Sequence, residues 1–390
     1  MFSSLFLKKS WTKYLILLVS MLLIDSAELR GAGLSIIEPL DYQVFQRRSQ
    51  AKGDVRIRGM MDEALSDSAL FEVRVITDGV IGDWVKLKVS RQGKQFSSSL
   101  ELPAGGWYRF ELRASLVGNS IAESFVEHIG VGEVFVVAGQ SNSANHGEVK
   151  QSTRTSRVAT FDGQRWQLAN DPQPGASGNG GSFLPPLGDA LVEKMNVPVG
   201  FLACGIGATS VREWLPKGTA FPNPPTIESR VEKNSEGQWV SKGDAYARFV
   251  SRMKQLGTHG FRAVLWHQGE SDANQKDSTR TLPGALYSEY LKKIVHDSRR
   301  ELGWDAPWFV AQVSYHVPGD EASSDIREAQ ASLWEDGLAV QGPDSDALKG
   351  ELRERDGKGV HFSNQGLREH AARWAEKISP WLDSQLRTSR

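Results

Sequence analysis

Short runs of alternating polar and apolar residues dominate residues 34–130. The clearest runs are 55–58, 71–75, 85–89 and 107–113. A period of two is typical of strands that bury only one face. Turn-forming clusters such as Asp78-Gly79 and Gln92-Gly93 separate the runs, at spacings that suit a small all-β unit. The pattern therefore predicts a β-sandwich domain over residues 34–130.

From Val131 onward the apolar residues gather in continuous runs instead. These runs are 133–138, 199–203, 263–266 and 308–313, and the amphipathic stretches are 187–195, 245–256, 287–302 and 366–382. Continuous apolar strands are typical of a parallel sheet covered on both faces. Strands that alternate with helices predict a three-layer α/β/α domain over residues 131–390. Two long loops, 170–186 and 216–243, are candidates for building a site, and the second contains a hairpin-like stretch at 231–240.

The N-terminus has the pattern of a secretory signal. Lys8, Lys9 and Lys13 precede an apolar run over 14–24, and small residues follow it up to Gly33. The run is shorter than the roughly 20 residues that a membrane-spanning helix needs. The pattern predicts a signal peptide over residues 1–33, export to the periplasm or the medium, and no stable membrane insertion after cleavage. An uncleaved membrane anchor is the alternative.

The composition narrows the choice of partner. With 46 Lys and Arg against 47 Asp and Glu, the formal net charge is -1, which disfavours nucleic acid or an anionic membrane as a partner. Cys204 is the only cysteine, so no intramolecular disulfide can form. The eight histidines are not spaced as a zinc site, and we predict neither a metal nor a cofactor. Nothing in the pattern defines an oligomeric state.

Four polar segments follow predicted strands or precede the last helix, where open α/β sheets bind their ligands. Segment 139–142 presents Ser141 as a nucleophile, and 204–210 has glycines whose N–H groups could face an oxyanion. Segment 266–272 offers the Gln268 amide, and 356–363 offers the His361 imidazole as a base. Taken singly, each segment also fits an ordinary role as a helix cap, a tight turn, a polar loop or a solvated histidine.

Together the four segments resemble the SGNH hydrolases, in particular the sialate O-acetylesterases and the carbohydrate acetylesterases of the acetylxylan esterase type. The resemblance covers residues 131–382 and includes the stretch 327–330. It implies a flavodoxin-like three-layer hydrolase domain, here after an immunoglobulin- or fibronectin III-like sandwich. It also implies that Ser141 is the nucleophile, that His361 is the general base, and that the N–H groups of Ser141 and Gly207 and the Gln268 amide form the oxyanion hole. The remaining polar residues of these blocks are expected to bind substrate or support the site: Gln140, Asn142, Glu270 and Asp272.

The acid of the triad departs from the family pattern. The family places it three residues before the histidine, where this chain has Lys358. We expect Asp356, five residues before His361, to orient the imidazole, with Asp344 and Asp346 as alternatives. Ala208 also replaces a second glycine of the family, which should leave the Gly207 N–H available.

The resemblance implies a carboxylic ester hydrolase that removes O-acetyl groups from carbohydrates through an acyl-serine. Its partner would be an acetylated carbohydrate, of a kind that fold and motif do not define. Two alternatives remain open at this point: an esterase for other esters, and a carbohydrate-binding protein with a decayed site. A structural envelope protein would not explain the four segments.

Overall fold

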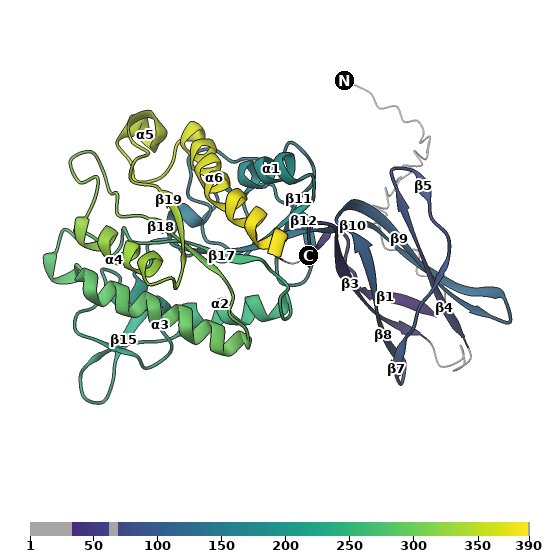
Figure 1. Ribbon diagram of the computed structural model, residues 1–390. Coiled ribbons are helices and arrows are strands. Elements are labelled where there is room, and N and C mark those ends of the chain that lie inside the picture. The colour runs from purple at the N-terminus through teal and green to yellow at the C-terminus, as the bar shows by residue number, and fades with distance from the viewer. Residues whose placement is uncertain (1–32, 62–68, 389–390) are drawn as a thin grey trace, which may run out of the picture.

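The computed structural model describes residues 33–61 and 69–388, which form an all-β lobe followed by an α/β lobe (Figure 1). The predicted signal peptide lies outside the described residues, apart from Gly33. Among the residues that are described, no helix is both long enough and apolar enough to cross a membrane.

Two sheets of the N-terminal lobe share one core, and both are antiparallel except for β2, which pairs in parallel with β10. The strands are β1 (Leu34–Glu38), β2 (Gln43–Gln46), β3 (Lys52–Met61), β4 (Leu70–Thr77), β5 (Val80–Ile81), β6 (Val85–Lys86), β7 (Ser90–Gln92), β8 (Gln95–Pro103) and β9 (Gly105–Leu116). One sheet has the order β1-β3-β8-β7, and in the other β4 pairs with β9. Val55 and Ile57 of β3 face Phe110 and Leu112 of β9 in the same fully buried cluster, as the alternating pattern predicts.

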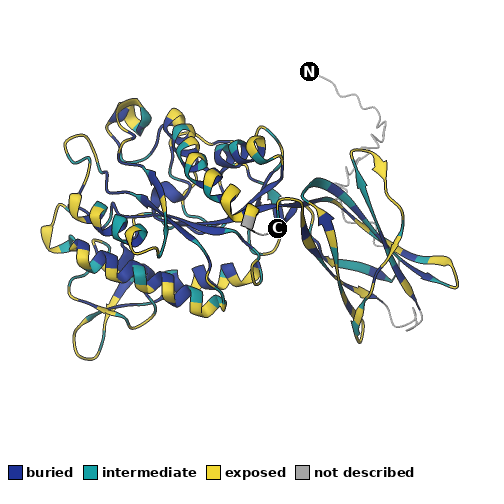
Figure 2. Cartoon of the chain, in the orientation of Figure 1, coloured by how far each residue is buried: buried dark blue, intermediate teal, exposed yellow. Residues whose placement is uncertain are grey.

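Strand β10 (Asn119–Gly139) belongs to both lobes. Its first half pairs antiparallel with β9, and its second half pairs in parallel with β13 (Val199–Ala203) and β17 (Ala263–His267). The predicted boundary between residues 130 and 131 therefore falls inside a strand. The hydrophobic pattern changes there because the strand passes from a half-buried sheet into a fully buried one (Figure 2). The division into domains stays a prediction.

The sheet of the C-terminal lobe has the order β12-β11-β13-β10-β17-β18-β19 and is parallel except for β12. The strands not yet introduced are β11 (Val158–Phe161), β12 (Trp166–Leu168), β18 (Trp308–Gln312) and β19 (Val340–Asp344). Helices α1 (Leu184–Met195) and α6 (Asn364–Thr388) pack on one face. Helices α2 (Asp244–Gln255), α3 (Gly284–Leu302) and α4 (Ser324–Glu335) pack on the other (Figure 1).

The strands and helices predicted for this lobe are confirmed, and most of their bounds differ by up to three residues. The exceptions are the strand predicted over 133–138, which is the last part of β10, and the last helix, which continues beyond Leu382 to Thr388. The terminal helix buries the residues whose spacing predicted its apolar face, from Leu367 to Leu382. The hairpin predicted in the second long loop is formed by β15 (Val231–Lys233) and β16 (Trp239–Ser241), which β14 (Ala220–Phe221) extends. The sequence pattern missed the short strands β11 and β12, the strand β19, which contains a glycine and a proline, and helix α4.

The short elements lie mainly near the carboxyl edge of the sheet. They are the 3-10 turns η1 (Ser141–Ser143), η2 (Val211–Trp214), η3 (Glu228–Arg230), η4 (Ser278–Arg280) and η5 (Gly350–Leu352), and the single turn α5 (Glu354–Gly357).

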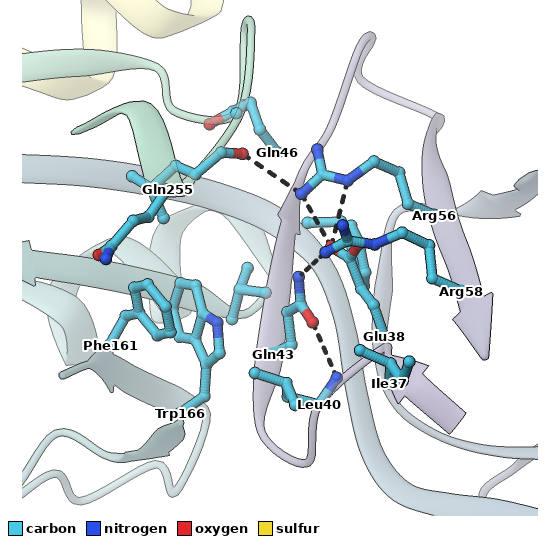
Figure 3. Close-up of a pocket in the computed structure, with 14 residues that line it drawn as sticks. Ile37, Glu38, Leu40, Gln43, Gln46, Arg56, Arg58, Phe161, Trp166 and Gln255 are labelled. Carbon is cyan, nitrogen blue, oxygen red and sulfur yellow. Dashed lines mark hydrogen bonds and ion pairs between the residues drawn. The ribbon is translucent and has the colours of Figure 1, made fainter. Parts of the chain in front are cut away.

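Charged side chains lie where the two lobes meet. At a pocket of about 90 Å³, the buried Glu38 carboxylate accepts hydrogen bonds from Arg56, Arg58 and Gln43 (Figure 3). The stacked rings of Phe161 and Trp166 face it from the α/β lobe. On β10, the fully buried Glu133 carboxylate lies between Arg47 at 2.5 Å and Arg262 at 2.7 Å. Removal of one arginine would leave the buried Glu133 charge only partly compensated, so both ion pairs help to hold the segments after β2 and before β17 against β10.

Candidate active site

A cavity of about 700 Å³ opens where the parallel strands end. Residues that follow β10, β13 and β17 contribute Ser141, Gly207 and Glu270 to its lining, and the segment before α6 contributes His361. Three of the four predicted segments thus meet the fourth at one edge of the sheet, as expected for ligand sites in open α/β sheets.

A sharp turn after β10 presents Ser141. Gly139 has φ 129°, and a Cβ atom at this position would lie 2.0 Å from the carbonyl oxygen of His267, so only glycine fits there. Gln140 N–H then donates to the same carbonyl at 2.9 Å, and Ser141 begins η1. Ser141 is 6% exposed, and its Oγ has no hydrogen-bond partner among the described residues. The hydroxyl is therefore free to interact with a ligand in the cavity.

The His361 imidazole is held by a carboxylate on one side. Its Nδ1 lies 3.0 Å from Glu354 Oε1, and the backbone N–H of Glu354 donates to the His361 carbonyl at 2.8 Å. Burial lowers the pKa of His361 from its ordinary value, although the negative charge of Glu354 acts to raise it. The imidazole is accordingly neutral near pH 7. With Nδ1–H donated to Glu354, the other nitrogen, Nε2, is free to accept a proton.

The carboxylate on His361 is not the one expected from the sequence. Arg355 and Asp356 both adopt left-handed backbone conformations, with φ 55°, and this turn leaves Asp356 exposed while Glu354 lies against the ring. The prediction that Asp356 contacts His361 is therefore wrong, and the carboxylate on the imidazole belongs to Glu354.

Neither alternative aspartate contacts His361 in the described part of the chain. Asp344 pairs with Arg327 at 2.8 Å, and Asp346 accepts hydrogen bonds from Ser314 and Tyr315. The stretch 327–330 therefore does not line the cavity but contacts residues that neighbour the site. Gln330, which is fully buried, donates to the carbonyl oxygens of Gln268 and Val313.

The Gln268 amide is not available to an oxyanion in this structure. It is fully buried and does not line the cavity, and its Nε2 donates to Asp272 Oδ2 at 2.7 Å and to the Thr209 carbonyl at 3.0 Å. Asp272 lies four residues further on and competes for the amide hydrogens, because a buried carboxylate needs donors. The expectation that Gln268 acts as an oxyanion donor is corrected to a scaffolding contact.

Gln140 and Asn142 tie the segments of the site together. The Gln140 side-chain oxygen accepts from Gln268 at 3.2 Å and from Ser271 N–H at 3.0 Å. The Asn142 amide donates to Glu270 at 3.1 Å and to the Val360 carbonyl at 3.2 Å, next to His361. Since Asn142 links the segment after β10 to the segments after β17 and before α6, it fixes Ser141 relative to His361.

The Gly207 N–H faces the cavity region but already has an acceptor. It donates to Ser177 Oγ at 2.6 Å, and this hydroxyl also lies 3.1 Å from His146 Nε2. The His146 ring is stacked on His361, with centroids 5.4 Å apart. Sequence reasoning named the long loop that carries Ser177 but neither Ser177 nor His146, because no motif marks them.

Glu270 is a carboxyl group buried at the cavity wall. It is 3% exposed, its Oε1 accepts from Asn142, and its Oε2 is buried without a partner among the described residues. Burial raises the pKa of Glu270 to about 7, although the hydrogen bond from Asn142 acts to lower it. The carboxyl is thus protonated in a substantial fraction of molecules at neutral pH, and its ionisation costs folded-state free energy.

We expect Glu270→Gln to stabilise the protein at pH 8 but not at pH 4. Below the ordinary pKa of 4.5, folded and unfolded chains are both protonated at this position, so the amide changes little. As the pH rises from about 4.5 to about 7, the wild type loses stability because its unfolded chain ionises more readily, and the full loss, reached above about pH 7, is about 3 kcal/mol. Urea unfolding at both pH values measures the difference.

The matched control is Glu236→Gln, on the exposed hairpin between β15 and β16, for which we expect changes below about 0.5 kcal/mol at either pH. An equal effect of Glu270→Gln at pH 4 and pH 8 would contradict the environment described for this carboxyl.

Comparison with known proteins identifies the family of the α/β lobe. A family model described as carbohydrate esterase, sialic acid-specific acetylesterase matches residues 131–379, more than half of the chain and all four segments. The chain therefore belongs to this family of carbohydrate esterases. The resemblance inferred from the motifs is confirmed. No curated protein sequence matches the chain.

Solved structures that match the chain include two carbohydrate esterases. A carbohydrate acetylesterase from Xanthomonas citri is 17% identical, with a TM-score of 0.52, and the match covers 88% of this chain and 73% of that one. A carbohydrate esterase family 2 enzyme with a carbohydrate-binding domain, from Corynascus thermopiles (Myceliophthora fergusii), is 10% identical, with a TM-score of 0.37 and coverage of 90% and 99%. The first likeness supports the mixed α/β fold.

The described residues contain no group of side chains that is suited to bind a metal ion. Within 33–61 and 69–388, no three or more histidine, cysteine, aspartate or glutamate side chains are grouped so that they could hold a metal ion. The side chains that line the cavity include three serine hydroxyls, three imidazoles and the carboxyl group of Glu270, which suit acyl transfer by a nucleophile and a base.

Proposed function

We propose that this protein is an exported serine esterase that removes O-acetyl groups from carbohydrates, with Ser141 as nucleophile, His361 as general base and Glu354 as the acid that orients it. The observation that carries the proposal is the 3.0 Å contact of His361 Nδ1 with Glu354, in a cavity that Ser141 also lines. This is the base and orienting-acid relation of a catalytic triad. No hydrogen bond joins Ser141 Oγ to His361 among the described residues; such bonds often form only when substrate is bound.

In the proposed reaction, His361 Nε2 takes the proton of Ser141 as Oγ attacks the acetyl carbonyl carbon. The tetrahedral intermediate carries a negative oxygen, and backbone N–H groups near Ser141 stabilise it. Its collapse breaks the bond to the sugar oxygen, which leaves with the proton from His361. Water then attacks the acetyl-serine, His361 accepts a proton from it, and acetate departs as that proton returns to Oγ.

The same proposal includes the finer features of the fold and the location. We assign the C-terminal lobe to the three-layer SGNH type and the N-terminal lobe to a β-sandwich, and we expect the segment before residue 34 to direct export. The helices on both faces of the parallel sheet support the first assignment, and the shared core of two mainly antiparallel sheets supports the second.

The proposal is tested by acetate release from a panel of acetylated polysaccharides, with p-nitrophenyl acetate as a general ester. We expect hydrolysis of p-nitrophenyl acetate and of at least one acetylated polysaccharide, and loss of both with Ser141→Ala. Binding of a polysaccharide without acetate release, together with no hydrolysis of p-nitrophenyl acetate, would instead indicate a binding protein. Hydrolysis of p-nitrophenyl acetate alone would contradict the carbohydrate assignment.

A further inference from the structure

Ser177 belongs to the long loop 170–186 and lines the cavity, and two backbone hydrogen bonds fix its position. Its backbone N–H donates to the Gly205 carbonyl at 2.9 Å, and its own carbonyl accepts from Asn145 N–H at 2.9 Å. The part of the loop that follows Ser177 is tightly packed: a Cβ atom at Gly178 would lie 2.2 Å from the Asn145 carbonyl oxygen, and one at Gly181 would lie 2.0 Å from that of Val149. The backbone of Ser177 is therefore positioned before any ligand binds.

The Ser177 hydroxyl has two neighbours that can donate to it. Gly207 N–H donates to Oγ at 2.6 Å, and His146 Nε2 lies 3.1 Å from the same atom. A hydroxyl has one hydrogen and two acceptor lone pairs. If His146 donates through Nε2, both lone pairs are occupied and the hydroxyl hydrogen is left to point into the cavity that Ser141 and His361 line.

The opposite arrangement, in which Ser177 donates to His146, suits the reaction less well. It would leave a lone pair of Oγ toward the cavity, where negative charge develops during attack on an acetyl group, and the two would repel. Charge that develops in the transition state favours donors that are already oriented. The Gly207 N–H, already engaged with Ser177, would then act on the oxyanion through the hydroxyl that it polarises.

We propose that the Ser177 hydroxyl is a side-chain donor to the oxyanion, and that His146 is a positioning residue that directs its hydrogen into the cavity. This inference rests on the proposed function. The Ser177 hydroxyl would take the role first expected of the Gln268 amide, which donates to Asp272 and to the Thr209 carbonyl instead.

Kinetics of Ser177→Ala with p-nitrophenyl acetate test the inference. We expect kcat to fall by about 10²-fold, which is typical for loss of one oxyanion donor, with KM changed by less than about threefold. Phosphonylation of Ser141 by an aryl methylphosphonate should slow by a similar factor, because its tetrahedral adduct also carries a negative oxygen. Ser152→Ala, at an exposed serine outside the cavity, is the matched control and should keep the wild-type kcat.

His146 is tested by a double-mutant cycle. We expect His146→Ala to lower kcat by about 10-fold or more and to add little to Ser177→Ala, since both act through one hydroxyl. His146→Gln, which keeps an N–H donor, should recover much of the loss. A structural role of His146 would instead give additive losses and no recovery with glutamine.

Three results for Ser177→Ala would overturn the inference. They are a wild-type kcat with a wild-type KM, a wild-type kcat with a KM raised about 10²-fold, and a higher kcat, which would show that the hydroxyl blocks the Gly207 N–H. The proposed function fails separately, if Ser141→Ala keeps activity in the same assay. The two failures are therefore distinguishable.

Discussion

Ser141→Ala is expected to lower kcat for acetyl-ester hydrolysis by about 10⁴- to 10⁶-fold, and His361→Ala by a comparable factor. Alanine at 141 removes the atom that would form the acyl bond, and alanine at 361 removes the base that would accept its proton. Because the two groups act as one unit, the double variant should be hardly slower than either single variant. Steady-state kinetics on p-nitrophenyl acetate measure all three.

The loss should come without unfolding, because Ser141 Oγ has no hydrogen-bond partner to lose. Thermal unfolding of each variant checks this point. His296→Ala, at an exposed histidine of α3, is the matched control and should keep the wild-type kcat. A near-normal kcat for either site variant would show that the reaction does not use this pair.

Glu354→Gln carries the second large expected effect, a loss in kcat of about 10²- to 10⁴-fold. A glutamine amide can place its N–H group against His361 Nδ1 and so favour the tautomer whose Nε2 is protonated. That tautomer cannot accept the serine proton. The fold should persist, because glutamine has the same size and can still accept the hydrogen bond from His361 N–H.

Asp356→Asn is the control that separates the structure from the sequence expectation. Asp356 is exposed, and we expect its variant to stay within about threefold of the wild-type kcat. Kinetics of the two variants on one acetyl ester decide the matter. A large loss for Asp356→Asn with a small one for Glu354→Gln would restore the assignment made from the sequence.

The sequence was informative wherever a short local pattern determines the geometry. Gly139 must be a glycine because the chain turns against the neighbouring strand, so a serine two residues later is presented at the sheet edge. Continuous apolar runs likewise marked β13, β17 and β18. Family resemblance then placed Ser141 and His361 together, and both line the same cavity.

The remaining features depend on contacts that no local pattern contains. Glu354 lies seven residues before His361, beyond the nearest aspartate, and it reaches the ring only because Arg355 and Asp356 form a left-handed turn. Gln268 has the expected chemistry, but a carboxylate four residues later takes its amide hydrogens. The continuation of β10 through both lobes was hidden because its hydrophobic pattern changes where its environment changes.

The most direct test of the central claim is to identify the covalent intermediate. The protein is mixed with p-nitrophenyl acetate, quenched in acid within the first turnovers, digested and examined by mass spectrometry. The account predicts an acetyl group on the side chain of Ser141 and no such adduct in Ser141→Ala. An acetyl group on a different residue that turns over at the rate of catalysis, or one that persists in Ser141→Ala, would contradict it.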